Sequence, residues 1–200
     1  LLLSAQLLEE LKNYDLAIAT YDAVPRSHPA FVKAELGRAQ ALVSIGKKET
    51  AIEVLTQLSE SFPTMRGVHD ALGNLLRQDG QFDAAIKVYD TAISMIKNPE
   101  PKHWYNFYVR AIAYERDGNW AAAIRDFDNA LVLSPNQFQV LNYLGYSLVE
   151  RGERLDEALS MIQLAVVAQP NAGYIIDSLG WVQYKLCLLY TSDAADDTLC

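Results

Sequence analysis

The sequence has 200 residues, of which 50% are hydrophobic and 21% are charged, and its formal net charge is −8. This balance lacks the clustered Lys and Arg that nucleic acids and anionic membrane surfaces attract, and no apolar run reaches the roughly 18 residues of a membrane span. We therefore expect a globular chain with no nucleic-acid partner and no membrane insertion. The chain does not begin with Met, which indicates a fragment.

A period of 34 residues organises the sequence. Gly46 and Gly80 are 34 residues apart, and so are Gly118 and Gly152. A small residue, Ala or Gly, stands seven residues before each of these glycines, and Ala follows five or six residues after it. Small residues let two helices approach closely, and glycine ends a helix in the left-handed conformation at low cost. The period therefore predicts an all-α chain of helix–turn–helix units.

In chain order the units are five repeats and a half-repeat, at 1–31, 32–65, 66–99, 104–137, 138–172 and 173–186. Proline closes the second helix of several units, because it cannot continue a helix. Large apolar residues such as Leu42, Tyr89, Phe127 and Leu148 recur at helical spacing between the small ones, and they are the expected core.

Three segments carry the pattern most clearly: VHDALGNLLRQDGQFDAAIKVYDTAI, YVRAIAYERDGNWAAAIRDFDNALVLSPN and LNYLGYSLVERGERLDEALSMIQLAVVAQPN. On these motifs nearly all of 1–186 resembles the tetratricopeptide repeat (TPR) family, which implies a right-handed α-solenoid that binds proteins. The segments HWYNFYVRAIAYERDGNW and GYIIDSLGWVQYKL are similar to bacterial, proteobacterial-type TPR proteins that are often exported or lipid-anchored. This narrower resemblance leaves the compartment open and favours a periplasmic or outer-membrane-associated setting over the cytoplasm.

The chain departs from the family pattern at two positions of structural interest. Lys12 stands where the first repeat should have its turn glycine, and Arg110 stands where Leu is usual. Asp126 and Asp128 flank the core residue Phe127, and we expect both to lie on a solvated helix surface.

The resemblance implies a binding groove, because the first helix of each TPR lines the concave face of the solenoid. Carried over position by position, the expected groove residues are Asn74, Arg77, Tyr105, Tyr108, Ile112, Arg116, Asn142, Tyr143, Tyr146, Glu150, Tyr174, Asp177, Trp181 and Tyr184. Six of the eleven tyrosines fall in this set, and Tyr and Trp are common anchors of interfaces. The favoured interpretation is an aromatic groove for a peptide or a partner helix. The alternative is that these tyrosines pack between adjacent repeats or against a following repeat.

One class of partner can be tested against the sequence. TPR domains that bind chaperone tails hold the terminal carboxylate with Lys, Asn and Arg. Asn74 stands at such a position, but Asp70 occupies the place that needs Lys. Because a carboxylate would repel the ligand, we predict no binding of chaperone tails.

Signs of catalysis or metal binding are weak. His28, His69 and His103 form no i, i+4 pair, and we expect structural or solvated roles for them. The glycines are not clustered into a phosphate-binding loop, and no nucleophile motif is present. We therefore expect a non-catalytic scaffold without cofactor or metal. Two alternatives remain: the repeat region of a larger enzyme, such as a TPR-bearing transferase with its catalytic domain elsewhere, and a self-assembly module that associates through uncapped ends.

The tail, residues 187–200, breaks the period. A turn glycine is due at 187, where the chain has Cys187, and Ala is due at 192, where it has Ser192. Asp196 stands where a large apolar residue belongs. The stretch CLLYTSDAADD resembles translated sequencing-adaptor or frameshift tails of proteins predicted from metagenomic assemblies. We expect 187–200 to be a non-TPR tail, artefactual or disordered, with a genuine divergent cap as the alternative.

Overall fold

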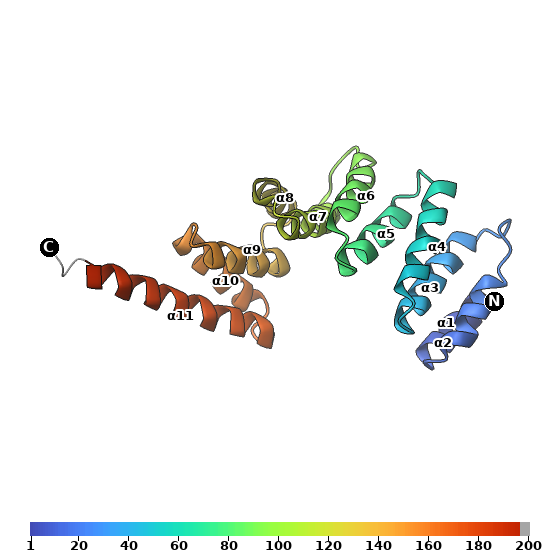
Figure 1. Ribbon diagram of the computed structural model, residues 1–200, viewed down its shortest axis with the longest axis horizontal. Coiled ribbons are helices and arrows are strands. Elements are labelled where there is room, and N and C mark those ends of the chain that lie inside the picture. Colours follow the sequence, from blue (N-terminus) through green and yellow to red (C-terminus); the bar gives the residue numbers. More distant parts are fainter. Residues whose placement is uncertain (197–200) are drawn as a thin grey trace. The chain divides into compact units, whose positions relative to one another are not determined.

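The computed structural model describes the backbone of residues 1–196 and the side chains of residues 1–187. The described chain is all-α, as the sequence predicts, and contains no strand. Its elements are α1 (Leu2–Glu10), α2 (Tyr14–Asp22), α3 (Phe31–Ser44), α4 (Lys48–Ser61), α5 (Arg66–Gln78), α6 (Phe82–Ser94), the 3-10 helix η1 (Pro101–His103), α7 (Trp104–Arg116), α8 (Trp120–Leu133), α9 (Phe138–Arg151), α10 (Leu155–Ala168) and α11 (Gly173–Asp196) (Figure 1).

The helices belong to two compact units. Unit 1 comprises Leu1–Asn98 and Ile112–Trp120, and unit 2 comprises Pro99–Ala111 and Ala121–Cys200. Successive helices pair in the order α1–α2, α3–α4, α5–α6 and α9–α10, and α11 packs on α9 and α10. The helix contacts that the structure describes within each unit thus join near neighbours in the chain, which is the contact pattern of a repeat protein.

The turn glycines have the conformation that the period requires. Gly46, Gly80, Gly118 and Gly152 have φ angles between +69° and +86°. At each one, the amide of the next residue bonds the carbonyl four residues before the glycine, as in Gln81 N to Leu76 O at 2.9 Å. This pattern is a Schellman motif, in which a left-handed residue ends the helix and satisfies its last carbonyls.

Lys12 adopts the same turn without being glycine. Its φ angle is +58°, and its neighbours repeat the hydrogen bonds of the glycine turns, with Asn13 N bonded to Leu8 O at 2.8 Å. A side chain in the left-handed region costs on the order of 1 kcal/mol. The Lys12 turn is therefore formed at a cost that the glycine turns avoid. Arg154, in the one-residue insertion before α10, is the other described non-glycine residue with positive φ, at +48°.

Small residues inside the helices accept large ones from the partner helix. A Cβ added to Gly73 would lie 2.6 Å from the Tyr89 ring, and one added to Gly145 would lie 2.8 Å from Ile162. Tyr89 and Ile162 are buried to within 1% of full burial. These contacts set how closely the two helices of a pair approach each other.

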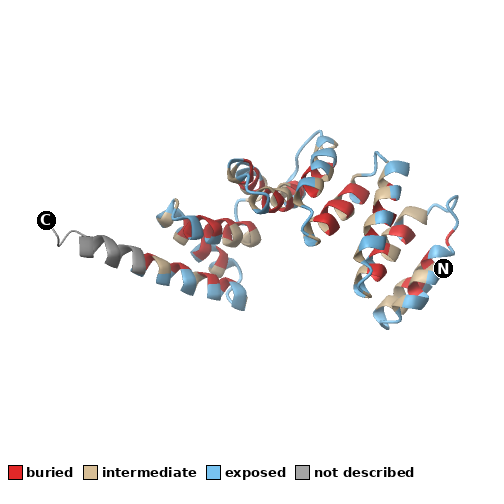
Figure 2. Cartoon of the chain, viewed as in Figure 1, coloured by how far each residue is buried: buried red, intermediate tan, exposed pale blue. Residues whose placement is uncertain are grey.

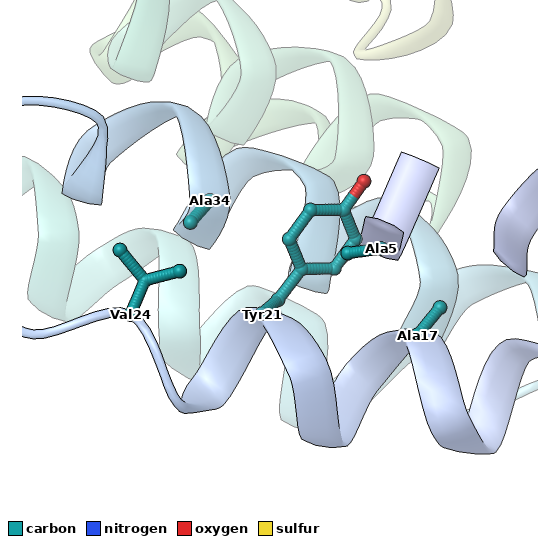
Figure 3. Packing of buried hydrophobic residues seen from close by; sticks show 5 residues of the cluster. All are labelled: Ala5, Ala17, Tyr21, Val24 and Ala34. Atoms are coloured by element: carbon teal, nitrogen blue, oxygen red, sulfur yellow. The ribbon is translucent and has the colours of Figure 1, made fainter. Parts of the chain in front are cut away.

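The first helix pair has the same arrangement around Tyr21. Figure 3 shows the Tyr21 ring among the small side chains Ala5 of α1, Ala17 of α2 and Ala34 of α3, with Val24 beside them. The Tyr21 hydroxyl donates a hydrogen bond to the Glu9 carboxylate of α1. Burial, and secondarily this contact with Glu9, raise the pKa of Tyr21 well above its ordinary value.

Asp126 corrects one expectation from the sequence. It is buried, not solvated, with 4% of its surface exposed. The guanidinium of Arg110 on α7 donates Nε and Nη2 to the two Asp126 carboxylate oxygens of α8, at 2.6 and 2.8 Å. The Arg110 guanidinium also lies 5.9 Å from the centre of the Phe107 ring. An ion pair thus occupies the position at which two other repeats have the buried side chains Leu72 and Leu144, and Asp126 compensates the charge of Arg110 there.

The last repeat lacks the turn that its predecessors have. α11 continues as a helix through Cys187 to Asp196, where the period would place a turn after residue 186. Accordingly, a Cβ added to Gly180 would meet no atom within 4 Å, whereas the equivalent Gly145 faces Ile162. Within the described residues, the Gly180 face of α11 has no partner helix. Residues 197–200 of the predicted tail lie outside the part of the chain that the structure describes.

Candidate protein-binding surface

The predicted groove residues of unit 1 are largely engaged within the unit. Asn74 on α5 accepts a hydrogen bond from the Tyr89 hydroxyl at 2.9 Å, and Ile112 is buried at 8% exposure. Arg77 is half-buried, and its Nε is shielded from solvent without a hydrogen-bond partner among the described residues. The exposed Arg116 guanidinium lies 5.6 Å from the centre of the Phe82 ring. Of the four, Arg116 offers the most accessible side chain.

In unit 2, several predicted groove tyrosines form one packed group with neighbouring rings. We define the aromatic column as Trp104, Tyr105, Tyr108, Phe127 and Tyr143. Tyr108 contacts Phe127 and Tyr143, with ring centres 6.3 and 6.1 Å apart, and the Phe127 and Tyr143 centres are 5.6 Å apart.

Phe127 is fully buried, whereas Tyr108 and Tyr143 are half-buried. For Tyr108 and Tyr143 this geometry agrees with the alternative interpretation, packing between repeats. Tyr105 lies at the exposed end of the aromatic column, with its ring 6.4 Å from Tyr108, and is 42% exposed.

The remaining predicted residues of unit 2 lie on α9 and α11. Tyr146 and Glu150 are four residues apart on α9, so they share a face of that helix. On α11, Tyr174, Asp177, Trp181 and Tyr184 follow one another at spacings of three and four, and all four are exposed. Figure 2 shows exposed residues alternating with buried ones along α11. The buried face, with Ile175, Val182 and Leu186, holds α11 against the rest of unit 2.

Glu150 joins the two exposed faces. The Trp181 indole Nε1 donates a hydrogen bond to Glu150 Oε1, which also lies 3.7 Å from Lys185 Nζ. The Tyr184 ring stands 5.7 Å from the Trp181 ring. We call Tyr146, Glu150, Trp181 and Tyr184 the α9–α11 patch. In it, a fixed carboxylate is flanked by exposed aromatic rings on two helices. Asn142, one turn before Tyr146, is half-buried, and its Oδ1 has no hydrogen-bond partner among the described residues.

Two features of unit 2 were not predicted from the sequence: the packing of Trp104 and an ion pair between α7 and α8. Trp104 begins α7 and packs against Tyr105 and Tyr108, with both ring-centre distances 5.6 Å. Its signal was the unbroken run of aromatic and polar residues at the start of the fourth repeat. The pairing of Arg110 with Asp126 was also missed, although the basic residue at an apolar position was its signal.

The histidines have local roles. His69 Nε2 lies 3.0 Å from the Pro63 carbonyl, and His28 Nδ1 accepts the Ala30 amide at 3.0 Å. His103 Nδ1 accepts the Glu100 amide at 2.9 Å and so closes the loop before α7. Across the described residues, His, Cys, Asp and Glu form no group of three that could hold a metal ion. Each histidine therefore fixes a loop or a helix start, as expected from the sequence.

Two further observations bear on function. A cavity of about 80 Å³ beside Phe31 and Glu35 in unit 1 is far smaller than the roughly 300–1,000 Å³ of ordinary ligand pockets. No helix in the described part of the chain has the length and apolar character to cross a membrane.

The paired helices, the left-handed turns and the small-residue contacts define an α-helical repeat protein. The family model described as "Psidin, N-terminal TPR repeats region" matches residues 7–130, more than half of the chain, and the model "Tetratricopeptide repeat" matches residues 108–173. The chain belongs to the tetratricopeptide repeat family. TPR folds typically mediate interactions between proteins, generally without catalysis.

A curated relative of the chain is a proteobacterial TPR protein. The chain is 25% identical, over 188 residues, to the TPR repeat-containing protein PA4667 of Pseudomonas aeruginosa. The match covers 90% of this chain, and the chain spans only 30% of the length of that relative.

Solved structures share the fold. A tetratricopeptide repeat protein from Parabacteroides merdae superposes with a TM-score of 0.77 at 16% identity, covering 99% of this chain and 77% of that one. MamA from Desulfovibrio magneticus RS-1 gives a TM-score of 0.70 at 16% identity, covering 84% and 93%. The thermophilic TPR protein TTC0263 from Thermus thermophilus gives 0.67 at 20% identity, covering 92% and 97%. At these identities the likeness concerns the fold alone.

Proposed function

We propose that this chain is a non-catalytic scaffold that binds a peptide or a partner helix on the exposed aromatic surface of unit 2. The observation that carries the proposal is the α9–α11 patch, in which Tyr146, Trp181 and Tyr184 remain 38–54% exposed and the Trp181 indole is hydrogen-bonded to Glu150. Exposed clusters of Tyr and Trp provide large contact areas with polar tips at low cost in conformational entropy.

The accessible side chains narrow the predicted groove. Tyr108, Ile112 and Tyr143 contribute mainly to packing, so we place the contact surface on Tyr146, Glu150, Tyr174, Asp177, Trp181 and Tyr184. Tyr105, at the end of the aromatic column, is a further exposed aromatic residue of unit 2. A ligand anchored by aromatic rings on α9 and α11 is the binding mode that this arrangement favours.

Selection from a displayed library of random 12-residue peptides tests the proposal directly. The full chain should enrich a defined set of sequences, and the variant Tyr146→Ala/Tyr184→Ala should lose them. The matched control is Val132→Ala/Val167→Ala, which truncates two exposed apolar side chains of α8 and α10, 79% and 78% exposed, and should retain binding. Circular dichroism of all variants should be unchanged. Enrichment that the Tyr146→Ala/Tyr184→Ala variant retains would contradict the proposed surface.

A further inference from the structure

The Lys185 side chain of α11 lies over the Trp181 ring of the same helix and near Glu150 of α9. Its ammonium Nζ lies 5.0 Å from the centre of the Trp181 ring and 3.7 Å from Glu150 Oε1. A cation within about 6 Å of an indole face is attracted by the electrons of the ring, and the carboxylate adds a charge partner. The α9–α11 patch therefore already holds one cation, supplied by the chain itself.

The hold on Lys185 is loose. Its ion pair with Glu150 is 3.7 Å long, beyond hydrogen-bonding distance, while the same carboxylate oxygen takes the Trp181 N–H. The Lys185 and Glu150 side chains keep 32% and 39% of their surface exposed. Exposed pairs of this kind contribute little free energy, because solvent screens them and both long side chains lose rotamer freedom. Lys185 can therefore be displaced at small cost.

The groups around the Lys185 ammonium are held in place more firmly than Lys185 itself. Glu150 is oriented by the Trp181 N–H, Trp181 is flanked by the Tyr184 ring, and both rings stand on a helix whose other face is buried. Asp177 shares the exposed face of α11 with Trp181 and forms no ion pair among the described residues. With Lys185 displaced, two carboxylates and two aromatic rings remain, in a chain whose net charge is −8.

We propose that Glu150, Trp181 and Tyr184 form a receptor for a Lys or Arg side chain of the bound peptide, and that Lys185 occupies this receptor in the free protein. The inference rests on the proposed function and specifies the chemistry of its ligand. Charge complementarity selects this ligand. An acidic peptide would meet Glu150 and Asp177 as like charges, and an apolar side chain that displaced Lys185 would cover Glu150 without a charge partner.

A minimal probe isolates the receptor. The peptide acetyl-Ala-Lys-Ala-amide is titrated into the full chain, and the indole N–H signal of Trp181, assigned with Trp181→Phe, is followed by NMR. The signal should shift saturably with this peptide but not with its Nε-acetyl-lysine counterpart, which has the same backbone and no charge. Equal shifts with both peptides, or no saturable shift with either, would overturn the proposal.

Two variants, each with a matched control, separate the role of Glu150 in the receptor from that of Lys185 as its occupant. Lys185→Met removes the competing ammonium and should tighten the probe about 2- to 5-fold, the equivalent of an exposed cation–π contact. Lys102→Met, at an exposed Lys elsewhere in unit 2, makes the same change of net charge and should leave affinity unchanged. Glu150→Gln should abolish the saturable shift, while Glu153→Gln should not. Tightening by both Lys variants alike would reduce the effect to net charge and contradict a built receptor.

The peptide selection distinguishes this inference from the proposed function. Enriched peptides should carry Lys or Arg and lose affinity when that residue is replaced by norleucine. Enriched peptides that depend on Tyr146 and Tyr184 but carry no required basic residue would sink the receptor and leave the scaffold proposal standing. A saturable lysine-peptide shift without any enriched 12-mer would do the reverse.

Discussion

The turn at Lys12 carries a measurable strain, because its φ of +58° is one that glycine adopts freely and lysine does not. Lys12→Gly should raise the free energy of unfolding by about 1 kcal/mol, measured by urea denaturation of the full chain. Lys12→Ala keeps a Cβ in the same conformation and should gain little. If Ala stabilised as much as Gly, the effect would come from the lysine side chain and not from the backbone.

Gly145 and Gly180 occupy equivalent places in successive repeats, yet they should respond oppositely to alanine. The Cβ of Gly145→Ala would lie 2.8 Å from Ile162 Cγ1 and 2.9 Å from the Ala158 carbonyl oxygen, so we expect a loss of about 1–3 kcal/mol. Gly180→Ala meets open space inside a helix and should gain about 0.5–1 kcal/mol. Thermal unfolding followed by circular dichroism measures both. Destabilisation by Gly180→Ala would mean that another group packs on that face of α11.

At the scale of helices, the Arg110–Asp126 pair joins α7 to α8 inside unit 2. Removing one partner leaves a buried charge uncompensated, and Asp126→Ala should cost about 3–5 kcal/mol. The double change Arg110→Leu/Asp126→Ala restores the residue usual in other repeats and removes both charges, so most of this loss should return. A double-mutant cycle by chemical denaturation gives the coupling. Additive losses would show that the two groups act independently despite their 2.6 Å contact.

The contact of α1 with α2 should make stability depend on alkaline pH. Because the folded chain raises the pKa of Tyr21, mainly by burial, the neutral hydroxyl is favoured in the folded state. Its contribution is complete below the pKa of an unfolded tyrosine, about 10, and is lost as pH rises through the higher folded value. The chain should therefore lose stability above pH 10.

The variant Tyr21→Phe keeps the ring against Gly37 but has no hydroxyl to ionise. The difference in urea midpoint between the two proteins should be constant below pH 10 and should shift in favour of Phe above it. The other tyrosines titrate in both proteins and cancel in the comparison. Parallel pH profiles for the two proteins would contradict the raised pKa.

For the whole molecule, the repeat period was enough to predict the fold, because each turn needs one residue in the left-handed conformation and each helix pair needs a small residue facing a large one. Both requirements leave marks in the sequence, as Gly80 and the Gly73–Tyr89 contact show. The substitution at Lys12 did not abolish its turn, because the hydrogen bonds of the Schellman motif form there as well. The positions of the turns and of the close helix contacts could thus be predicted from individual residues.

The surface was harder to predict, because position in a repeat does not determine what a side chain packs against. Tyr143 and Tyr146 are both expected groove residues, but Tyr143 packs on Phe127 whereas Tyr146 stays exposed. Asp126 looks solvated in sequence because its partner Arg110 lies sixteen residues away on another helix. Such contacts depend on the packing between helices, which a period does not encode.

Because the helices contact mainly their neighbours, a destabilising substitution should affect mainly the helices around it. In a repeat protein, stability is close to a sum of unit and interface terms, so a cavity should weaken the nearby helices most. Tyr89→Ala in α6 and Ile162→Ala in α10 each empty a fully packed site, beside Gly73 and Gly145 respectively. Hydrogen exchange read by mass spectrometry should show protection lost around α5 and α6 for the first variant, and around α9 to α11 for the second.

If the chain instead unfolded as a single cooperative core, both variants would lose protection everywhere. A local loss in each variant, at opposite places, distinguishes the two cases. Core truncations of this size cost about 2–5 kcal/mol, enough to change exchange rates by more than tenfold where the effect is local. In the Tyr89→Ala variant, α9 and α10 should keep nearly normal protection, and in the Ile162→Ala variant α5 and α6 should do so. Equal loss of protection along the whole chain in both variants would mean that the described residues unfold as one unit, against the short-range contacts that join their helices.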